Sequence, residues 1–117
     1  MSTFLTITDD NFEAEVLRSK IPVLLDFTAD WCPPCRALEP LLEGLMAEAQ
    51  GTFRVGKINV DHNPRVTTQY GVRSAPTLIT FVEGQPIRSH VGLTSKENLR
   101  RLVARSEGPK SQDREGR

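Results

Sequence analysis

The strongest structural signal in the 117-residue sequence is Val23-Leu24-Leu25-Asp26-Phe27-Thr28-Ala29-Asp30-Trp31-Cys32-Pro33-Pro34-Cys35. Its first part is almost continuously apolar, which is typical of a strand covered on both faces. Its second part holds the only two cysteines of the chain, three positions apart, where this strand passes into a helix. Two such thiols can close a reversible disulfide, and Cys32 would lie at the helix N-terminus, where a thiolate is stabilised. The stretch therefore predicts a strand, a redox-active turn and a helix.

A long helix follows this stretch. Apolar residues recur at the spacing i, i+3, i+4, i+7, i+8 and i+11 between Leu38 and Ala49, which predicts one buried helix face. Because a residue that precedes a proline resists helical geometry, we expect the helix to begin at Pro34 and to end near Ala49. Pro40 lies inside this helix, where it removes one N–H donor and should kink the axis.

The rest of the chain alternates strand-like and helix-like segments. Besides the segments above, we expect strands over residues 3–7, 53–60, 77–82 and 86–91 and helices over residues 8–19, 63–71 and 94–105. Since helices separate all strands but the last two, the order predicts an α/β fold around a mixed sheet. We place the domain at residues 1–107. Residues 108–117 are polar throughout, and we expect them to form a disordered tail.

Composition limits the classes of partner. The sequence carries fifteen basic and fifteen acidic residues, a net charge of zero, and no basic block. A nucleic acid or an anionic membrane is therefore a poor match, and a protein or small-molecule partner is favoured. Residues 1–10 lack the basic and apolar regions of a secretion signal, and no apolar run approaches the roughly 20 residues of a membrane span. We expect a cytoplasmic protein and a monomer.

A cysteine pair can also form a permanent disulfide or part of a metal site. A bond that closes so short a loop removes little chain entropy, and the cytoplasm is reducing, so a purely structural disulfide is disfavoured. A zinc site would need a second pair of ligands, and His62 and His90 stand in no recognised spacing with the cysteines. We therefore expect no metal and no bound cofactor, and we expect both histidines on the surface.

The residues themselves indicate how the pair would react. Exchange needs one thiolate that attacks a disulfide and a second thiol that resolves the mixed disulfide. Cys32 suits the first role, because it lies at the helix end, and Cys35, one turn inside and less exposed, suits the second. Asp26 lies in an apolar strand, where desolvation should raise its carboxyl pKa toward neutrality. A carboxylate of that kind near two thiols can accept the proton of the resolving thiol.

Taken together, these features resemble the thioredoxin family. The resemblance covers residues 6–107 and rests on motifs in a fixed order, namely Asp26, Trp31-Cys32-x-Pro34-Cys35, Pro40, Lys57, Ala75-Pro76-Thr77, Gly84 and Gly92. It implies a central mixed five-stranded sheet flanked by four helices, and the reduction of disulfides in client proteins, for this sequence. It also implies a thioredoxin reductase as the partner that recharges the dithiol.

The same resemblance assigns roles to further residues. It implies that Asp26 helps to deprotonate Cys35 and that Lys57, on a neighbouring strand, is the charge partner of Asp26. It implies a cis bond before Pro76, although only about one X-Pro bond in twenty is cis in folded proteins. The backbone of Ala75 would pair with a client peptide like an added strand. The other residues expected to contact a client are Trp31, Pro34, Val60, Ser74, Pro76, Val91 and Gly92.

Three positions depart from the common family pattern. Thr28 replaces an aromatic residue, Pro33 replaces glycine and Ala75 replaces a larger aliphatic residue. These departures leave open a specialised oxidant or isomerase with a dedicated client. Another alternative is a non-redox binding subunit of a larger assembly, although the intact cysteine pair argues against it. The main hypothesis is a general dithiol reductant, since no histidine between the cysteines adds a positive charge that would hold the thiolate.

Overall fold

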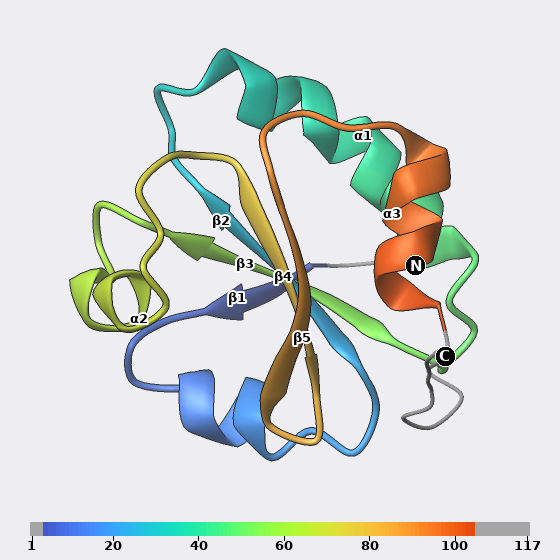
Figure 1. Cartoon of the computed structure of the whole chain (residues 1–117), viewed down its shortest axis with the longest axis horizontal. Coiled ribbons are helices and arrows are strands. Elements are labelled where there is room, and N and C mark those ends of the chain that lie inside the picture. Colours follow the sequence, from blue (N-terminus) through green and yellow to red (C-terminus); the bar gives the residue numbers. More distant parts are fainter. Residues whose placement is uncertain (1–3, 105–117) are drawn as a thin grey trace, which may run out of the picture.

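The computed structural model describes residues 4–104 of the chain. Its centre is a five-stranded sheet in the order β1-β3-β2-β4-β5 (Figure 1). The strands are β1 (Leu5–Ile7), β2 (Val23–Thr28), β3 (Arg54–Asn59), β4 (Thr77–Val82) and β5 (Gln85–Val91). β1, β3 and β2 run parallel, whereas β4 is antiparallel to β2 and β5 is antiparallel to β4. The mixed five-stranded sheet predicted from the sequence is confirmed.

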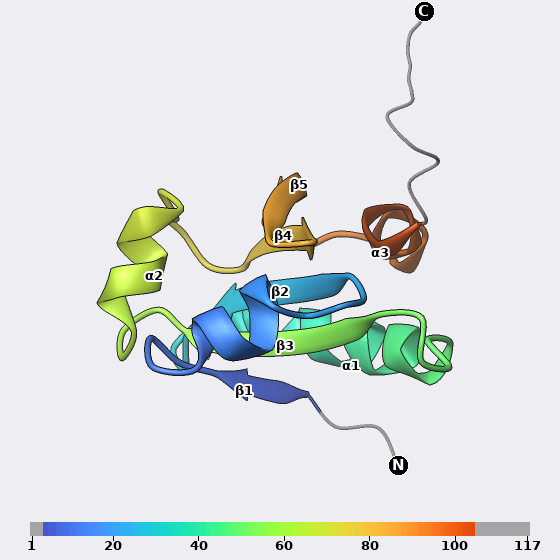
Figure 2. The same cartoon turned by 90° about the horizontal axis from the view of Figure 1, so that it is seen from below.

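Helices cover both faces of this sheet. Within the described residues they are η1 (Glu13–Leu17), α1 (Pro33–Ala47), α2 (Pro64–Gln69) and α3 (Lys96–Val103). α1 and α3 lie over one face, where Leu38 and Leu99 share a hydrophobic cluster with Leu24 of β2. η1 and α2 lie over the other face, where Val66 shares a cluster with Leu25 (Figures 1 and 2). Because residues of β2 contribute to both hydrophobic clusters, the sequence of this strand is apolar almost throughout.

The start of α1 differs from the sequence prediction. α1 begins at Pro33 rather than at Pro34. Cys32 serves as the N-cap in an extended conformation (φ −106°, ψ 103°), and its carbonyl oxygen accepts the N–H of Arg36 at 3.2 Å. This first helical hydrogen bond outweighs the preference of a residue before proline for extended geometry. The helix ends at Ala47, shortly before the predicted position.

The first and last helices also differ from their predictions. The helix expected over residues 8–19 is confined to η1, a single π-helical turn in which the N–H of Arg18 donates to the carbonyl oxygen of Glu13 at 3.0 Å. α3 is capped by Ser95 rather than by the threonine before it, because Ser95 Oγ accepts the N–H of Asn98 at 3.1 Å. The helix expected to start at residue 94 therefore begins two residues later, at Lys96.

β4 and β5, both expected as strands, form a hairpin. Val82 pairs with Gln85, so Glu83 and Gly84 make the turn, with φ values of 51° and 80°. Positive φ at both central residues is the geometry of a type I′ turn, whose twist matches that of the flanking strands. The hairpin therefore holds β5 beside β4 at one edge of the sheet (Figure 2).

One row of paired residues crosses all the strands. Thr6 pairs with Lys57, Lys57 with Asp26, Asp26 with Leu78, and Leu78 with His90. Residues opposite one another on neighbouring strands point to the same face of a sheet. Leu78 belongs to the cluster beneath α1 and α3, so the whole row faces these two helices. Asp26 thus lies in the middle strand, between a lysine and a leucine.

No helix within residues 4–104 is long and apolar enough to cross a membrane. The predicted domain end at residue 107 and the predicted tail, residues 108–117, lie outside the described residues.

Candidate active site

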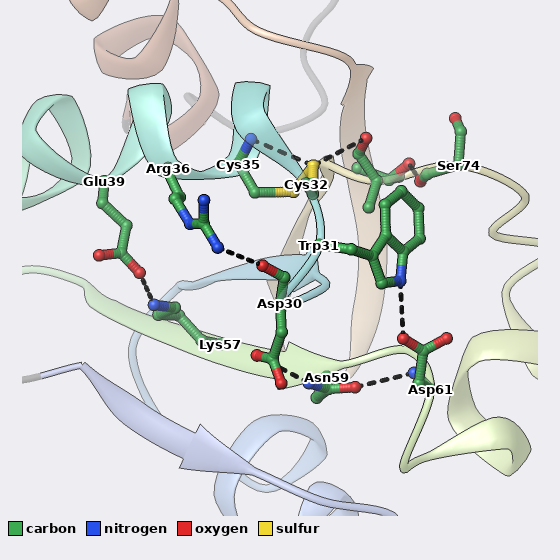
Figure 3. Close-up of a disulfide and its surroundings, with 12 residues drawn as sticks. Asp30, Trp31, Cys32, Cys35, Arg36, Glu39, Lys57, Asn59, Asp61 and Ser74 are labelled. Carbon is green, nitrogen blue, oxygen red and sulfur yellow. Dashed lines mark hydrogen bonds and ion pairs between the residues drawn. A yellow bond between two sulfur atoms is a disulfide. The ribbon is translucent and has the colours of Figure 1, made fainter.

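The cysteine pair lies where the chain leaves β2 and enters α1. Cys32 and Cys35 are joined by a disulfide, and their Cα atoms are 5.2 Å apart (Figure 3). Cys32 is the N-cap of α1, and Cys35 lies in its first turn. Pro33 and Pro34 occupy the two positions between them. Proline suits this end of a helix, because the N–H that it lacks would have no intrahelical partner there.

The sulfur atom of Cys32 has a backbone donor on one side and a backbone acceptor on the other. Its Sγ accepts the N–H of Cys35 at 3.1 Å and lies 3.4 Å from the carbonyl oxygen of Ala75 (Figure 3). The two prolines carry no N–H, so Cys35 is the first residue after Cys32 that can donate one. In the reduced protein the helix N-terminus and this N–H both favour a thiolate at Cys32.

The two cysteines are buried to nearly the same extent. Cys32 is 1% exposed and Cys35 is 2% exposed, so the expectation that Cys35 is the more covered residue is wrong for the disulfide form. Both cysteines pack with Ala29, Val60 and Ala75. Their chemical difference therefore comes from position, because Cys32 precedes the helix and Cys35 lies within it.

Asp26 lies completely buried on the face of the sheet that α1 covers. Neither of its carboxyl oxygens has a hydrogen-bond partner within the described residues. Burial raises the pKa of Asp26 to about 7, and the positive charge of Lys57 opposes part of that rise. The raised pKa predicted from the apolar sequence around Asp26 is therefore supported, with the predicted cause.

Lys57 lies beside Asp26 in the sheet but pairs with a different residue. Its Nζ forms an ion pair with Oε2 of Glu39 on α1 (Figure 3) and lies 5.1 Å from the centre of the Phe4 ring. The predicted charge partner thus acts on Asp26 through space, without a hydrogen bond. Glu39 was missed in the sequence, although it follows Cys35 by one helix turn and therefore shares its face.

A hollow of about 270 Å³ opens next to the cysteine pair. One wall is the chain before Pro76, and the peptide bond between Ala75 and Pro76 is cis, as the resemblance implied. The predicted contact residues that line the hollow are Trp31, Val60, Ser74 and Ala75. The lining residues that were not predicted are Asp61, Thr67, Val72 and Arg73. Asp61 and Arg73 directly adjoin the predicted residues Val60 and Ser74 in the sequence, which was the available signal for these two.

The other predicted contact residues lie outside this hollow. Pro34 is exposed on the first turn of α1, and Pro76 is buried. The carbonyl oxygen of Pro76 accepts the N–H of Gly92 at 2.8 Å, which brings the end of β5 against the proline loop. Val91 is 64% exposed and pairs in register with Thr77. Contact of these residues with a client stays a prediction.

Trp31 is held at the edge of the hollow although 65% of it is exposed. Its Nε1 donates a hydrogen bond to Oδ2 of Asp61 at 2.9 Å (Figure 3). The backbone N–H of Asp61 in turn donates to Oδ1 of Asn59 at 2.8 Å. An exposed aromatic ring whose orientation is fixed in this way is suited to contact a partner protein.

Residues 4–104 contain no group of three or more His, Cys, Asp or Glu side chains that could hold a metal ion. His62 is exposed, as expected. His90 is half-buried instead, and its Nδ1 lies 3.5 Å from Nδ2 of Asn98. His62 follows β3 and His90 lies on β5, so the two histidines belong to different parts of the fold.

A disulfide that bridges one helix turn can take up two electrons as two thiols and give them back. At the end of the central strand of this sheet, beside an open hollow, such a pair defines a thiol–disulfide oxidoreductase. The thioredoxin family model matches residues 3–105. The chain belongs to the thioredoxin family, and it is a protein-disulfide reductase.

Relatives with assigned names agree with this placement. The chain is 44% identical over 93 residues to thioredoxin of Rickettsia bellii, a match that covers 80% of this chain and 89% of the relative. It is 44% identical over 99 residues to thioredoxin 1 of a Nostoc species, covering 85% of this chain and 92% of the relative. It is 44% identical over 95 residues to thioredoxin of Acidithiobacillus ferridurans, covering 81% and 88%.

Proposed function

We propose that Cys32 is the attacking thiol of this reductase and Cys35 the resolving thiol. The Cys32 thiolate attacks one sulfur of a client disulfide, the client S–S bond breaks, and a mixed disulfide forms. Cys35 then attacks Sγ of Cys32, which releases the second client sulfur and closes the Cys32–Cys35 disulfide. The client gains two electrons and two protons, and the reductase loses them. The observation that carries this assignment is the N–H of Cys35 donated to Sγ of Cys32 at the helix N-cap.

Asp26 is proposed as the acceptor of the Cys35 proton in the second step. A proton acceptor works best when its pKa lies near the working pH, and burial raises the pKa of Asp26 to about 7. The group lies beneath the helix that carries Cys35. Lys57, which faces Asp26 in the sheet register, would stabilise the carboxylate through space.

The client is proposed to bind as an extended segment next to the disulfide. The hollow lined by Trp31, Val60, Ser74 and Ala75 supports this placement. The backbone of Ala75 would pair with the client like an added strand, with its carbonyl oxygen already 3.4 Å from Sγ of Cys32. Further contacts would come from Pro34, Pro76, Val91 and Gly92.

Turnover requires that the disulfide be reduced again, and we assign this step to a thioredoxin reductase that supplies two electrons from NADPH. The Cys32 thiolate has one backbone donor, the N–H of Cys35, and no histidine lies between the cysteines. A thiolate with so little stabilisation favours a reductant over an oxidant. The proposed compartment is the cytoplasm, where a dithiol of this kind stays reduced.

Trapping a client complex tests the order of attack. Cys35→Ser should attack once and stall as a covalent mixed disulfide, visible by mass spectrometry and released by dithiothreitol. Cys32→Ser should form no such adduct and should not reduce insulin. An adduct that forms through Cys35 in the Cys32→Ser protein would reverse the two roles.

The direction of electron flow needs a separate measurement. We expect the wild-type protein to turn over insulin with NADPH and a thioredoxin reductase, and to have a reduction potential in the reducing range of thioredoxins. A potential in the range of disulfide-forming oxidants would replace this proposal by the specialised oxidant or isomerase.

A further inference from the structure

The ion pair between Glu39 and Lys57 joins the helix that carries the cysteines to the strand beside Asp26. Glu39 lies on α1, one turn after Cys35, and Lys57 lies on β3. The side chains are 40% and 26% exposed, respectively, so the pair is partly shielded from water. On the other side, the ammonium group lies 5.1 Å from the centre of the Phe4 ring. It therefore has two partners, and neither is Asp26.

Most of the surface around Asp26 is apolar. β4 places Leu78 directly opposite it, and this leucine separates Asp26 from His90 in the row across the sheet. The titratable residues on the elements around it are Arg54 and Lys57 of β3, Arg88 and His90 of β5, and Cys35, Arg36, Glu39 and Glu43 of α1. Of the charged ones, Arg54 pairs with Glu15, Arg88 donates to the carbonyl oxygen of Leu102, and Arg36 and Glu43 are exposed.

α3 covers the same face and turns Leu99 and Leu102 toward the core. Its charged residues pair with Glu48 at the end of α1 or are exposed to solvent, namely Lys96, Glu97, Arg100 and Arg101. Lys57 is accordingly the cation whose charge reaches Asp26.

We infer that Glu39 is a positioning residue for the resolving step, because it holds the ammonium group of Lys57 at α1 and so withholds a hydrogen-bond donor from the carboxyl group of Asp26. The inference rests on the proposed role of Asp26 as acceptor of the Cys35 proton. Without the charge of Glu39, the flexible lysine side chain is free to turn to Asp26, its partner in the sheet register.

The direction in which Glu39 shifts the pKa of Asp26 follows from the charges of the three side chains. A cation that approaches Asp26 stabilises the ionised carboxyl group and lowers its pKa, whereas a carboxylate that neutralises this cation keeps the pKa high. During resolution the Cys35 proton moves to Asp26 while Sγ of Cys35 bonds to Sγ of Cys32, and the client sulfur leaves with the electron pair. Glu39 thus keeps Asp26 basic enough to take the proton of a thiol.

Glu39→Gln tests the inference, since it removes the charge and keeps the size of the side chain. We expect the titration midpoint of the Asp26 carboxyl group, followed by carbon-13 NMR on the reduced full-length protein, to move to lower pH. Lys57→Met should move it to higher pH. Glu43→Gln is the matched control, because it removes the same charge one turn later on α1, where the residue is exposed, and should leave the midpoint unchanged.

An unmoved midpoint in Glu39→Gln, or an equal shift in Glu43→Gln, overturns the inference. The double variant, with Glu39→Gln and Lys57→Met, tests whether Glu39 acts through Lys57. In the Lys57→Met background, Glu39→Gln should have little further effect, and a shift of full size there would mean that Glu39 does not act by positioning the lysine.

The kinetics of resolution separate this inference from the function on which it rests. The quantity to measure is the single-turnover rate of resolution at pH 6 as a fraction of its plateau at high pH. In Glu39→Gln we expect this fraction to rise about threefold, because the pH–rate profile follows the titration of Asp26. If the titration moves and the rate profile does not, the role of Asp26 as proton acceptor is overturned, while the effect of Glu39 on Asp26 stands.

Discussion

Asp26 is a carboxyl group that the fold buries without any hydrogen bond from the described residues. Such burial destabilises the ionised form, and proteins commonly avoid it. The position is useful for catalysis because the same burial raises the pKa of Asp26 to about 7. Stability and reactivity therefore oppose each other at this residue.

Replacing Asp26 should change both the stability of the fold and the rate of resolution. In Asp26→Ala at pH 8, we expect the free energy of unfolding to rise by about 1 to 4 kcal/mol, because an unpaired buried charge is removed. We expect resolution of the mixed disulfide to slow by roughly 10²-fold, because its proton acceptor is lost. Denaturant melts and single-turnover kinetics measure the two effects.

Asp26→Asn is the control of similar shape. It should slow resolution as Asp26→Ala does, while its buried amide gives a smaller gain in stability. A variant that loses stability and keeps its full rate would show that the carboxyl group is structural.

The sequence could predict some properties of single residues and not others. The raised pKa of Asp26 depends on its apolar neighbours in β2, which are adjacent in the chain. The contact between Lys57 and Glu39 depends on how α1 lies over β3. No local pattern in the sequence predicts that packing. The same holds for Trp31 and Asp61, whose hydrogen bond joins two loops.

At the level of elements, the N-terminus of α1 determines the chemistry of the site. Cys32 is the N-cap, and the side chain of an N-cap accepts hydrogen bonds from the second or third helical N–H. Pro33 and Pro34 fill the first two helical positions, so only the third position, Cys35, donates to the sulfur. The two prolines therefore limit the stabilisation of the thiolate without disturbing the helix.

This geometry predicts different results for the two prolines. Pro33→Gly adds an N–H at the first position, which does not point at the capping atom, so we expect the reduction potential to change by no more than about 30 mV. We also expect the free energy of unfolding to fall by about 0.4 to 1 kcal/mol, because glycine is more flexible in the unfolded chain.

Pro34→Gly is the matched comparison, since it adds an N–H at the second position, where it can reach Sγ of Cys32. Its potential should become more oxidising than that of Pro33→Gly. Redox equilibration with glutathione measures both variants, and a larger shift in Pro33→Gly would contradict the assignment of Sγ of Cys32 as the N-cap acceptor.

Whole elements were easier to predict than their ends. β2 and β4 follow from nearly continuous apolar runs, and β4 spans the predicted residues. The predicted start of α1 is wrong by one residue and that of α3 by two, because adjacent residues such as Thr94 and Ser95 are equally good caps in the sequence. Only the packed backbone determines which of them accepts the N–H of Asn98.

At the scale of the whole molecule, the pH dependence of stability combines two carboxyl groups whose pKa values are shifted in opposite directions. The pKa of Asp26 is raised from 3.8 to about 7 by burial. The pKa of Glu48, at the contact between α1 and α3, is lowered to about 2, first by the hydrogen bond from Arg100 and then by that from Lys96. Proton binding therefore stabilises the fold at one site and destabilises it at the other.

We predict that stability is greatest near pH 4 to 5 and falls on both sides. Between pH 4 and 7 the unfolded chain loses the Asp26 proton while the native protein keeps it, so the free energy of unfolding should fall by on the order of 4 kcal/mol and then level off. As pH falls from 4.5 toward 2, the contribution of Glu48 is lost.

Denaturant melts across this pH range measure the profile. In Asp26→Ala the fall between pH 4 and 7 should disappear, while the loss at acid pH should remain. A wild-type stability that rises from pH 4 to 7 would contradict the burial of an unpaired carboxyl group.

Trp31 gives the molecule an optical signal of its own state. It is the single tryptophan in the sequence and directly precedes Cys32. An excited indole ring next to a disulfide is quenched by electron transfer to the S–S bond, and a pair of thiols quenches it far less. Fluorescence should therefore brighten on reduction, and since 65% of Trp31 is exposed, the emission colour should shift when a client covers the ring. Both events can then be followed in real time without an attached dye.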